Sequence, residues 1–467
     1  MLERFLLAVS LLVPLAVGWR VLDFFDKKGH LPALERIFLA YGLGFGCVTL
    51  TMFYASLAGI GFDAVRAVFA FGAIWSAGAY LKGASLKTIT GSAGNIVSVL
   101  QNVNAAPFQF IISIFIFFNI AGLFMRTMLV EFDVWDSWFS WAFKAKIFYH
   151  HGIVPLGIYK MFDSVYGNWD YPLHVPLMET WVLLWLGSWN DYLPRILFPI
   201  FHAGICSIAF CFLMERVSFF AALTGAAFFA SFFGLQMYTI GTIAEPVLLF
   251  YYLASLTLLF RRKKEFDPGL FCLSAVFAGI ALWTKLEGCI LIAGNLGVIA
   301  FFLFPKANLP RAAGAVLSYL LIVLAVVAPW NFFKSSVNIN NLLLHVIHAQ
   351  SENFPVYFSR LLNIPFVFAG HFCNFKFWNI LWFMTVFAVI YNLVYKKDKT
   401  ANILILIIFF QIFVYACGYV VLFNVIEEHT LVLDTIPRLL FGPAILSILF
   451  CCMVLGSPKS IEISKTR

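Results

Sequence analysis

The sequence predicts an all-α polytopic membrane protein, because of its composition, the length of its apolar stretches and the placement of its charges. Hydrophobic residues make up 62% of the 467 residues and charged residues 12%, whereas a soluble domain has roughly 45–50% and 25%. The mean hydropathy is +0.91. The net charge of +8 comes from short basic clusters between apolar stretches, which indicates positive-inside topology and argues against a nucleic-acid partner.

The apolar stretches predict about thirteen transmembrane helices, because each helix needs roughly 20 mainly apolar residues. The stretches 218–260 and 270–304 can be divided in more than one way. Residues 1–22 also fit a cleaved signal peptide; removing them would place the RRKK cluster at 261–264 outside, so a retained helix is favoured. The predicted spans are 5–22, 36–60, 64–82, 108–130, 193–214, 218–236, 241–260, 270–286, 288–304, 312–330, 377–395, 401–423 and 437–455.

The charges assign a side to each loop, because Lys and Arg are retained on the cytoplasmic side of short loops. If residue 131 is external, alternation places every basic cluster inside: Lys27/Lys28, Lys82/Lys87, Arg216, Arg261 to Lys264, Lys306/Arg311, Lys396/Lys397/Lys399 and Lys459/Lys465/Arg467. The carboxylates outside the first loop then fall at the outer edge: Glu245, Glu287, Glu352, Glu427, Glu428 and Asp434. We therefore expect any chemistry on the outer face.

Two long external intervals, 131–192 and 331–376, divide the chain into groups of spans at 1–130, 193–330 and 377–467. The second interval has semi-apolar stretches that predict surface-lying helices. The first interval combines carboxylates with indole rings. Its acids are Glu131, Asp133, Asp136, Asp163, Asp170, Glu179 and Asp191, and its tryptophans are Trp135, Trp138, Trp141, Trp169, Trp181, Trp185 and Trp189.

The start of the first interval predicts an amphipathic helix along the outer interface, with Asp136 in its first turn. Its apolar face would carry Trp135, Trp138, Ala142, Ala145 and Tyr149 at three-and-four spacing, with Lys144 and Lys146 elsewhere. Interface anchoring alone explains tryptophans at such a site. It does not explain the repeated pairing of acid and ring in EFDVWD and NWDYP. This arrangement suits the binding of a sugar, because aromatic rings cover the C–H surface of the sugar and carboxylates accept hydrogen bonds from its hydroxyl groups.

Two other patterns have simpler explanations. The histidine pairs His150/His151 and His345/His348 could bind metal, but no convergent Cys or second carboxylate cluster accompanies them, so surface histidines are favoured. The GLGFG run at 42–46 lies inside an apolar span with no preceding strand, which favours close helix packing over a dinucleotide loop.

The segments WDSWFSWAFKAKIFYHHG (135–152) and WDYPLHVPLMETW (169–181) resemble the first external loop of GT-C membrane glycosyltransferases, in the branch of protein O-mannosyltransferases and bacterial aminoarabinose transferases. The resemblance continues at TIAEPVLLF (242–250), ALWTKLEG (281–288), APW (328–330) and DTIPRLLFGP (434–443). The adjacent acidic pair of the O-mannosyltransferases is here Asp136-Ser137, which leaves open which acid does the chemistry.

This resemblance implies a GT-C-like fold and transfer of a sugar from a polyprenyl-phosphate donor to a glycan, lipid or protein acceptor, with inversion, on the extracytoplasmic side of the cytoplasmic membrane. No cofactor would be obligatory, and a divalent metal has no support in the sequence. Asp136 would be the base, Asp170 a positioning or second acid, and Asp133 the fallback. The residues expected to bind substrate are Glu245, Lys285, Glu287, Arg438, His174, Trp135, Trp138 and Trp169.

Lys285 and Arg438 are the candidates for the donor phosphate, because ionisable residues at the ends of membrane spans are often functional. Snorkelling, or pairing with Glu287 and Asp434, is the structural alternative. At the level of function, the alternatives are a transporter or flippase of a lipid-linked sugar and a polysaccharide polymerase or ligase. A transporter would carry ionisable residues at mid-membrane depth, whereas here they gather at the outer edge.

Overall fold

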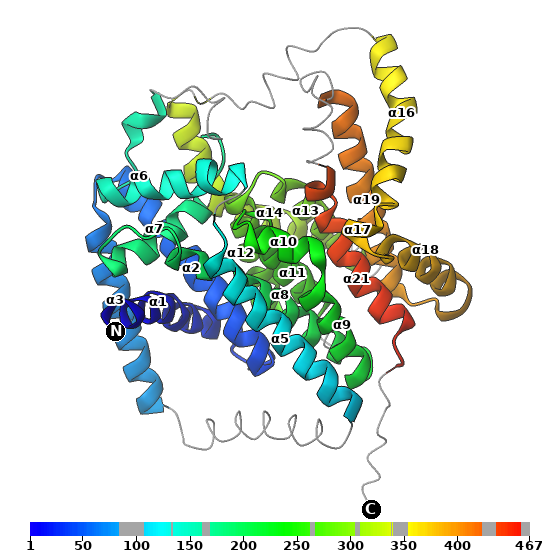
Figure 1. The fold of residues 1–467 in the computed structure, drawn as a ribbon, viewed down its shortest axis with the longest axis horizontal. Coiled ribbons are helices and arrows are strands. Elements are labelled where there is room, and N and C mark those ends of the chain that lie inside the picture. Colours follow the sequence, from blue (N-terminus) through cyan, green and yellow to red (C-terminus); the bar gives the residue numbers. More distant parts are fainter. Residues whose placement is uncertain are drawn as a thin grey trace, which may run out of the picture.

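The computed structural model describes residues 1–83, 107–131, 134–160, 169–261, 267–303, 309–337, 339, 354–422 and 436–458. Within these ranges every regular element is a helix, apart from one β-bridge between Val217 and Pro458 (Figure 1). The first half contains α1 (Leu2–Phe25), α2 (Ala33–Leu57), α3 (Phe62–Gly83), α5 (Pro107–Leu129), the π-helix η1 (Asp136–Ala142), α6 (Phe143–His151), η2 (Leu156–Lys160), α7 (His174–Leu186), η3 (Leu193–Ile196) and α8 (Leu197–Met214). The second half contains α9 (Phe219–Ser231), α10 (Phe233–Ile240), α11 (Glu245–Phe260), α12 (Pro268–Thr284), α13 (Gly288–Leu303), α14 (Leu309–Ser336), α16 (Phe354–Phe372), α17 (Phe375–Trp378), α18 (Leu381–Tyr391), η4 (Asn392–Lys396), α19 (Lys399–Leu422) and α21 (Phe441–Leu455).

Seven described helices are long and apolar enough to cross a membrane, and an eighth span results if α9 and α10, bent by 46°, count as one. Each predicted span overlaps a helix or this pair, except that 377–395 covers the end of α17, α18 and most of η4. Several of them, including α11, α12, α13 and α21, are shorter than 18 residues; at 1.5 Å per residue they extend roughly 23–26 Å, less than the roughly 30 Å hydrocarbon core. The all-α membrane class is therefore confirmed, whereas the number of thirteen spans stays a prediction.

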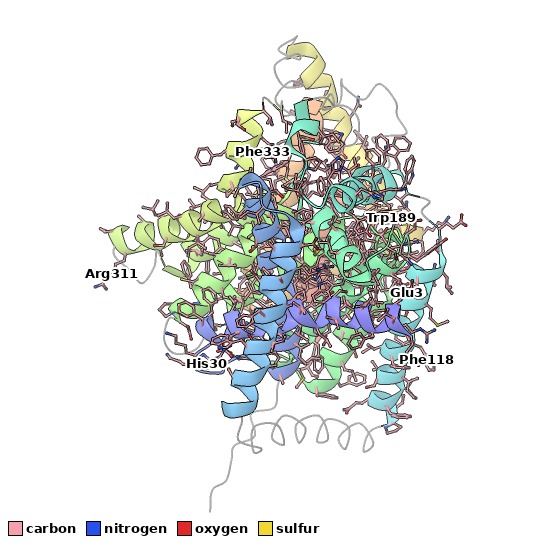
Figure 2. All side chains as sticks on the ribbon, turned by 90° about the vertical axis from the view of Figure 1, so that its left-hand side faces the viewer. Glu3, His30, Phe118, Trp189, Arg311 and Phe333 are labelled. Carbon is pink, nitrogen blue, oxygen red and sulfur yellow. The ribbon has the colours of Figure 1, made fainter. Side chains whose placement is uncertain are left out.

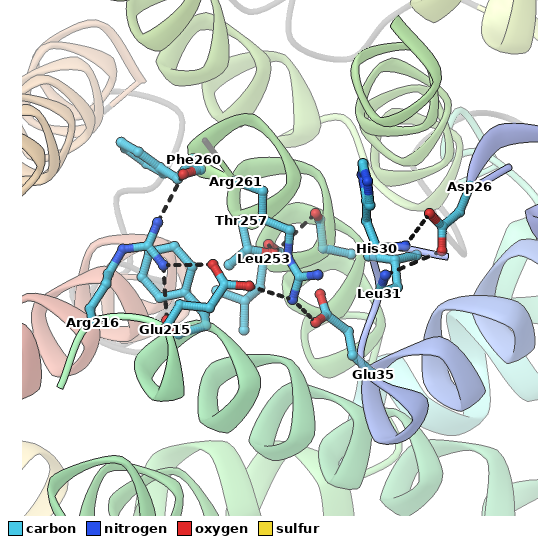
Figure 3. A network of polar contacts seen from close by, with 12 residues as sticks. Asp26, His30, Leu31, Glu35, Glu215, Arg216, Leu253, Thr257, Phe260 and Arg261 are labelled. Atoms are coloured by element: carbon cyan, nitrogen blue, oxygen red, sulfur yellow. Dashed lines mark hydrogen bonds and ion pairs between the residues drawn. The ribbon is translucent and has the colours of Figure 1, made fainter. Parts of the chain in front are cut away.

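Three helix ends that carry predicted basic clusters, those of α8, α11 and η4, lie together at one end of the bundle, which we call the basic end. Arg261, which follows α11, forms a buried ion pair with Glu35 in the first turn of α2 and lies 3.4 Å from Glu215 at the end of α8 (Figure 3). Lys396 in η4 donates to the Val454 carbonyl near the end of α21 at 3.0 Å. These contacts agree with the alternation that the charges predict. Other basic residues lie outside the described ranges: Lys87, Arg262, Lys263, Lys264, Lys306, Lys459, Lys465 and Arg467.

Because α11 begins at Glu245 and ends beside Arg261, Glu245 marks the opposite end of the bundle, which we call the acidic end. There the α2–α3 turn joins the segment after α6, since Phe62 N donates to the Gly152 carbonyl at 2.7 Å. Figure 2 shows Phe333 and Trp189 towards one end of the molecule and His30 towards the other.

Helices α1 and α2 approach each other closely through glycines. A Cβ added at Gly44 would overlap the carbonyl oxygen of Pro14, and one at Gly18 would overlap that of Ala40. The run at 42–46 therefore forms a close helix–helix contact, as the sequence predicts.

The interior also contains a hydrogen-bonded group that joins four helices. The Tyr319 hydroxyl of α14 lies 3.0 Å from Ser255 Oγ of α11 and 3.1 Å from Ser274 Oγ of α12, and it accepts from Asn295 Nδ2 of α13 at 3.0 Å. All four side chains are buried. Because polar groups at membrane depth must find partners within the protein, this group connects α11 to α14.

The latter part of the predicted external interval packs inside the protein. Every residue of α7 except Trp185 is buried, and Trp181 Nε1 donates to the Ser10 carbonyl of α1 at 2.8 Å. α7 thus packs against η1 and α6 from inside the protein. The candidate site lies beside these helices.

Candidate functional site

Five charged residues from distant parts of the chain meet at the acidic end. Glu245 Oε1 accepts from Arg438 Nε at 2.6 Å and from Lys285 Nζ at 2.9 Å. Arg438 Nη1 also contacts Asp136 Oδ2 at 2.5 Å, and Lys285 Nζ contacts Glu287 Oε1 at 2.7 Å. We call these five residues the charged cluster. Because both cations contact the same oxygen of Glu245, they lie side by side.

Helix ends place the members of the charged cluster. Glu245 is the first residue of α11, where a carboxylate suits the positive end of the helix dipole, and Lys285 follows the last residue of α12, where a cation suits the negative end. Arg438 stands just before α21. Because these helix ends, of either direction, all lie at the acidic end of the bundle, packing of the helices brings the charges together.

Asp136 is fixed through its neighbour. Ser137 Oγ shares a hydrogen bond of 2.5 Å with Thr242 Oγ1, in the turn between α10 and α11. Thr242 has a φ of 50°, which is unusual for a β-branched residue and is found where surrounding structure enforces it. This contact ties the start of η1 to the turn that precedes Glu245.

The charged cluster has a closed floor and a more open rim. The side chains of Glu245 and Lys285 are only 4% and 5% exposed, whereas those of Asp136 and Arg438 are 17% and 21% exposed. Lys285 lies between two carboxylates, Glu245 at 2.9 Å and Glu287 at 2.7 Å, so its buried charge is paired. A cavity of about 20 Å³, enough for one water molecule, lies beside Glu245, Lys285 and Arg438.

A second group of polar and aromatic residues adjoins the charged cluster. Lys144 Nζ, from the buried face of α6, lies 5.4 Å from the ring centroid of Trp169 and 5.7 Å from that of Trp141. Tyr171 stacks on Trp141 with centroids 5.8 Å apart, and its own centroid lies 6.0 Å from Lys285 Nζ. Asp170, between Trp169 and Tyr171 in the chain, is buried. Tyr171 therefore links the two groups.

Burial and charge act in opposite directions on Lys144 and Asp170. Burial lowers the pKa of Lys144 to about 7, while Asp170 and Asp136 act to raise it. Burial raises the pKa of Asp170, while Lys144 and Lys334 act to lower it. The two acids proposed from the sequence, Asp136 and Asp170, therefore both favour the charged form of Lys144.

The helix at 136–151 exists as predicted, but its buried face is a different one. Trp135 and Trp138 are 59% and 42% exposed, whereas Lys144 is fully buried beside Trp141. The predicted face is divided, because Trp135 and Trp138 are exposed while Ala142 and Ala145 are buried. The side that packs inside the protein instead carries Ser137, Trp141, Lys144, Ala145 and Phe148. Lys144 is thus the residue that sequence reasoning missed. Its sequence signal is that five aromatic residues lie within five positions of this lysine: Phe139, Trp141, Phe143, Phe148 and Tyr149.

The remaining candidates differ in their exposure. His174 is fully buried, with Nδ1 2.7 Å from Thr49 Oγ1 and Nε2 3.0 Å from Tyr251 OH. Both ring nitrogens are therefore engaged in the interior, so the contacts of His174 do not support substrate binding. Trp169 is also buried, so its ring covers Lys144 and does not offer an open face. Trp135 and Trp138 are exposed at the rim beside Asp136.

Several predicted residues lie outside the described ranges: Asp133, Asp163, His345, His348, Glu352, Glu427, Glu428 and Asp434. In the part of the chain that is described, no three His, Cys, Asp or Glu side chains lie together as a metal site.

An apolar groove of about 480 Å³ lies between α9, α18 and α21. It is lined from Phe220 at the start of α9 to Phe232 after its end, so it follows the length of that helix. At the acidic end, Phe232 and Trp378 contact Phe441, with ring centroids 6.0 Å and 5.5 Å away. Phe441 also lines the small cavity beside the charged cluster, so one end of the groove lies near this cavity.

Comparisons of the chain with protein-family models, curated proteins and solved structures find no match.

Proposed function

We propose that the protein is a membrane glycosyltransferase with a GT-C-like fold of about thirteen spans. It would transfer a sugar, with inversion, from a polyprenyl-phosphate donor to a glycan, lipid or protein acceptor. The acidic end would face the extracytoplasmic side of the cytoplasmic membrane. The observation that carries this proposal is the convergence of Asp136 with two adjacent cations, Arg438 and Lys285, at one end of a membrane-embedded bundle.

In this reaction the acceptor hydroxyl attacks the anomeric carbon while Asp136 takes its proton. General base catalysis of this kind contributes typically 10²- to 10⁴-fold. Arg438 holds only Oδ2 of Asp136, and the carboxylate keeps some exposure, which allows an acceptor to reach it. Trp135 and Trp138, close to Asp136 in the chain, are exposed, and we propose that their rings offer apolar faces to a sugar.

The bond from the anomeric carbon to the phosphate oxygen breaks, and the departing phosphate needs positive charge rather than a strong acid. Arg438 and Lys285 supply that charge from adjacent positions, already oriented by Glu245. A single carboxylate base therefore suffices, unlike the paired carboxylates of glycoside hydrolases.

A lipid donor also needs an apolar binding surface that reaches the phosphate site. The groove along α9 offers one, because Trp378 at its end contacts Phe441, which lines the cavity of the charged cluster. We propose that an isoprenoid chain in this groove directs its phosphate towards Arg438. This proximity supports a lipid-linked donor over a soluble nucleotide sugar.

The test uses membranes that contain the protein and a panel of radiolabelled polyprenyl-phosphate sugars, with release of label from the lipid as the readout. We expect the wild type to release one label, and Asp136→Asn to lose at least a hundredfold in rate while its abundance stays the same. Asp191→Asn is the control, because Asp191 is an exposed carboxylate of the same interval, bonded to Trp189 Nε1. Release by Asp136→Asn at the wild-type rate would remove Asp136 from the mechanism, and no release of any label by the wild type would refute the proposal.

A further inference from the structure

We propose that Lys144 is a positioning residue for sugar transfer: its ammonium group, buried on the inner face of α6, holds the carboxylate of Asp170 in place and acts on Asp136. Lys144 would touch neither substrate. This inference rests on the proposed function, and it assigns the second polar group of the acidic end a role in the same reaction.

The geometry around Asp170 supports this role. Trp169, the residue before Asp170, lies over Lys144, and Tyr171, the residue after it, stacks on Trp141, which also faces Lys144. The segment 169–171 is therefore fastened on both sides to the surroundings of one ammonium group. A movement of Lys144 would change the position of Asp170.

Burial makes the charge of Lys144 matter. The lysine is fully buried and Asp170 is 5% exposed, and a charge in such surroundings is tolerated only with an opposite charge nearby. When Lys144 loses its proton, Asp170 loses one of the two cations, Lys144 and Lys334, that act to lower its pKa. The charge of Lys144 thus helps to hold Asp170 as a carboxylate.

The charges that face Lys144 come from the elements packed around α6. Asp136 acts on it from η1 and Asp170 from the segment before α7. Lys334, at the end of α14, acts to lower the pKa of Asp170. The pKa of Glu179 in α7 depends on its own burial and on Arg195. Because burial brings the pKa of Lys144 to about 7, the lysine changes charge in the neutral range, and transfer should fall as pH rises above it.

The first test compares Lys144→Met, which keeps the length of the side chain without its charge, with Lys144→Arg, which keeps the charge at every pH. Lys146→Met is the matched control, because Lys146 lies two residues away on the exposed face of α6. Rates of sugar transfer are measured from pH 6 to 10 at several donor and acceptor concentrations. We expect Lys144→Met to lose roughly a hundredfold in kcat, as for other misplaced catalytic groups, with donor saturation unchanged.

We expect Lys144→Arg to keep measurable transfer and to shift the alkaline fall upward by at least one pH unit, and Lys146→Met to match the wild type. A wild-type rate and pH profile in Lys144→Met would overturn the proposal. If Lys144→Met does not accumulate, the arginine variant decides, and an alkaline fall at the wild-type pH in that variant would also overturn it.

A second readout does not depend on transfer. The folded pKa of Lys144 is lowered to about 7 from its usual 10.5, so between these values the unfolded chain binds a proton that the folded chain does not. The contribution of Lys144 to the free energy of unfolding therefore rises as the pH rises between these two pKa values. We expect the unfolding midpoint of the wild type in detergent to rise relative to that of Lys144→Met between pH 7 and 10.

Parallel midpoints across this range would mean that Lys144 is not a buried titrating group, and the inference would fail. A rising wild-type midpoint without transfer of any sugar would place the failure in the proposed function instead.

Discussion

Substituting Glu245 by glutamine is the most informative change in the charged cluster, because it removes one charge and keeps the shape. Glu245 Oε1 accepts from two cations at 2.6 Å and 2.9 Å, and its side chain is 4% exposed. Breaking a buried pair costs about 3–5 kcal/mol. Arg438 retains Asp136 and Lys285 retains Glu287, so we expect the lower limit of that range, about 3 kcal/mol in the free energy of unfolding.

The assay is thermal unfolding of the purified protein in detergent. A loss of about 3 kcal/mol corresponds to a fall in Tm of roughly 3 °C for a chain of this size. Glu287→Gln is the matched control, because Glu287 contacts the same lysine but its side chain is 20% exposed. For that variant we expect about 1 kcal/mol or less.

Equal Tm values for Glu245→Gln and the wild type would refute the reasoning that Glu245 is the negative centre of the charged cluster. So would a loss in Glu287→Gln as large as that in Glu245→Gln, because burial would then not decide the effect.

Two further predictions test the donor site and the packing of the first helices. Arg438→Gln should raise the donor concentration for half-maximal transfer by at least tenfold, because a hydrogen bond to a charged group contributes about 1.5–3 kcal/mol; donor titration in membranes measures this, and an unchanged value would favour a purely structural ion pair. Gly44→Ala should lower the free energy of unfolding by about 1–3 kcal/mol through overpacking against Pro14, whereas Gly78→Ala, with open space around its Cα, should not; equal unfolding midpoints for the two variants would contradict the close contact.

The charged cluster could be anticipated from the sequence because of the alternation of apolar spans. Helices that cross the same bundle in alternating directions bring every second loop to one end. Glu245, Lys285 and Arg438 each stand at a span boundary of the same parity as Asp136. Their convergence therefore follows from helix lengths and directions, without knowledge of the side-chain contacts. Whether these residues catalyse sugar transfer stays a prediction.

The pairing inside the charged cluster could not be read from the sequence. Pairing of Lys285 with Glu287 was a sequence alternative and is present at 2.7 Å, but Glu245 is 40 residues away from Lys285 and 193 from Arg438. Only the packing of α11 against α12 and the approach of the segment before α21 bring these groups together. The groove along α9 has the same origin, because it belongs to three helices that are distant in the chain.

By itself, the sequence determined the membrane class, the position of the helices and the end of the bundle at which the acids gather, because these depend on apolar length and charge along the chain. Only the tertiary structure decided which residues face inward around Asp136. Lys144 lies in the interior and Trp135 at the surface. The helical period alone cannot foresee this, because it does not say which side of the helix packs against the rest of the protein; that depends on contacts with residues distant in the chain, such as the hydrogen bond between Ser137 and Thr242.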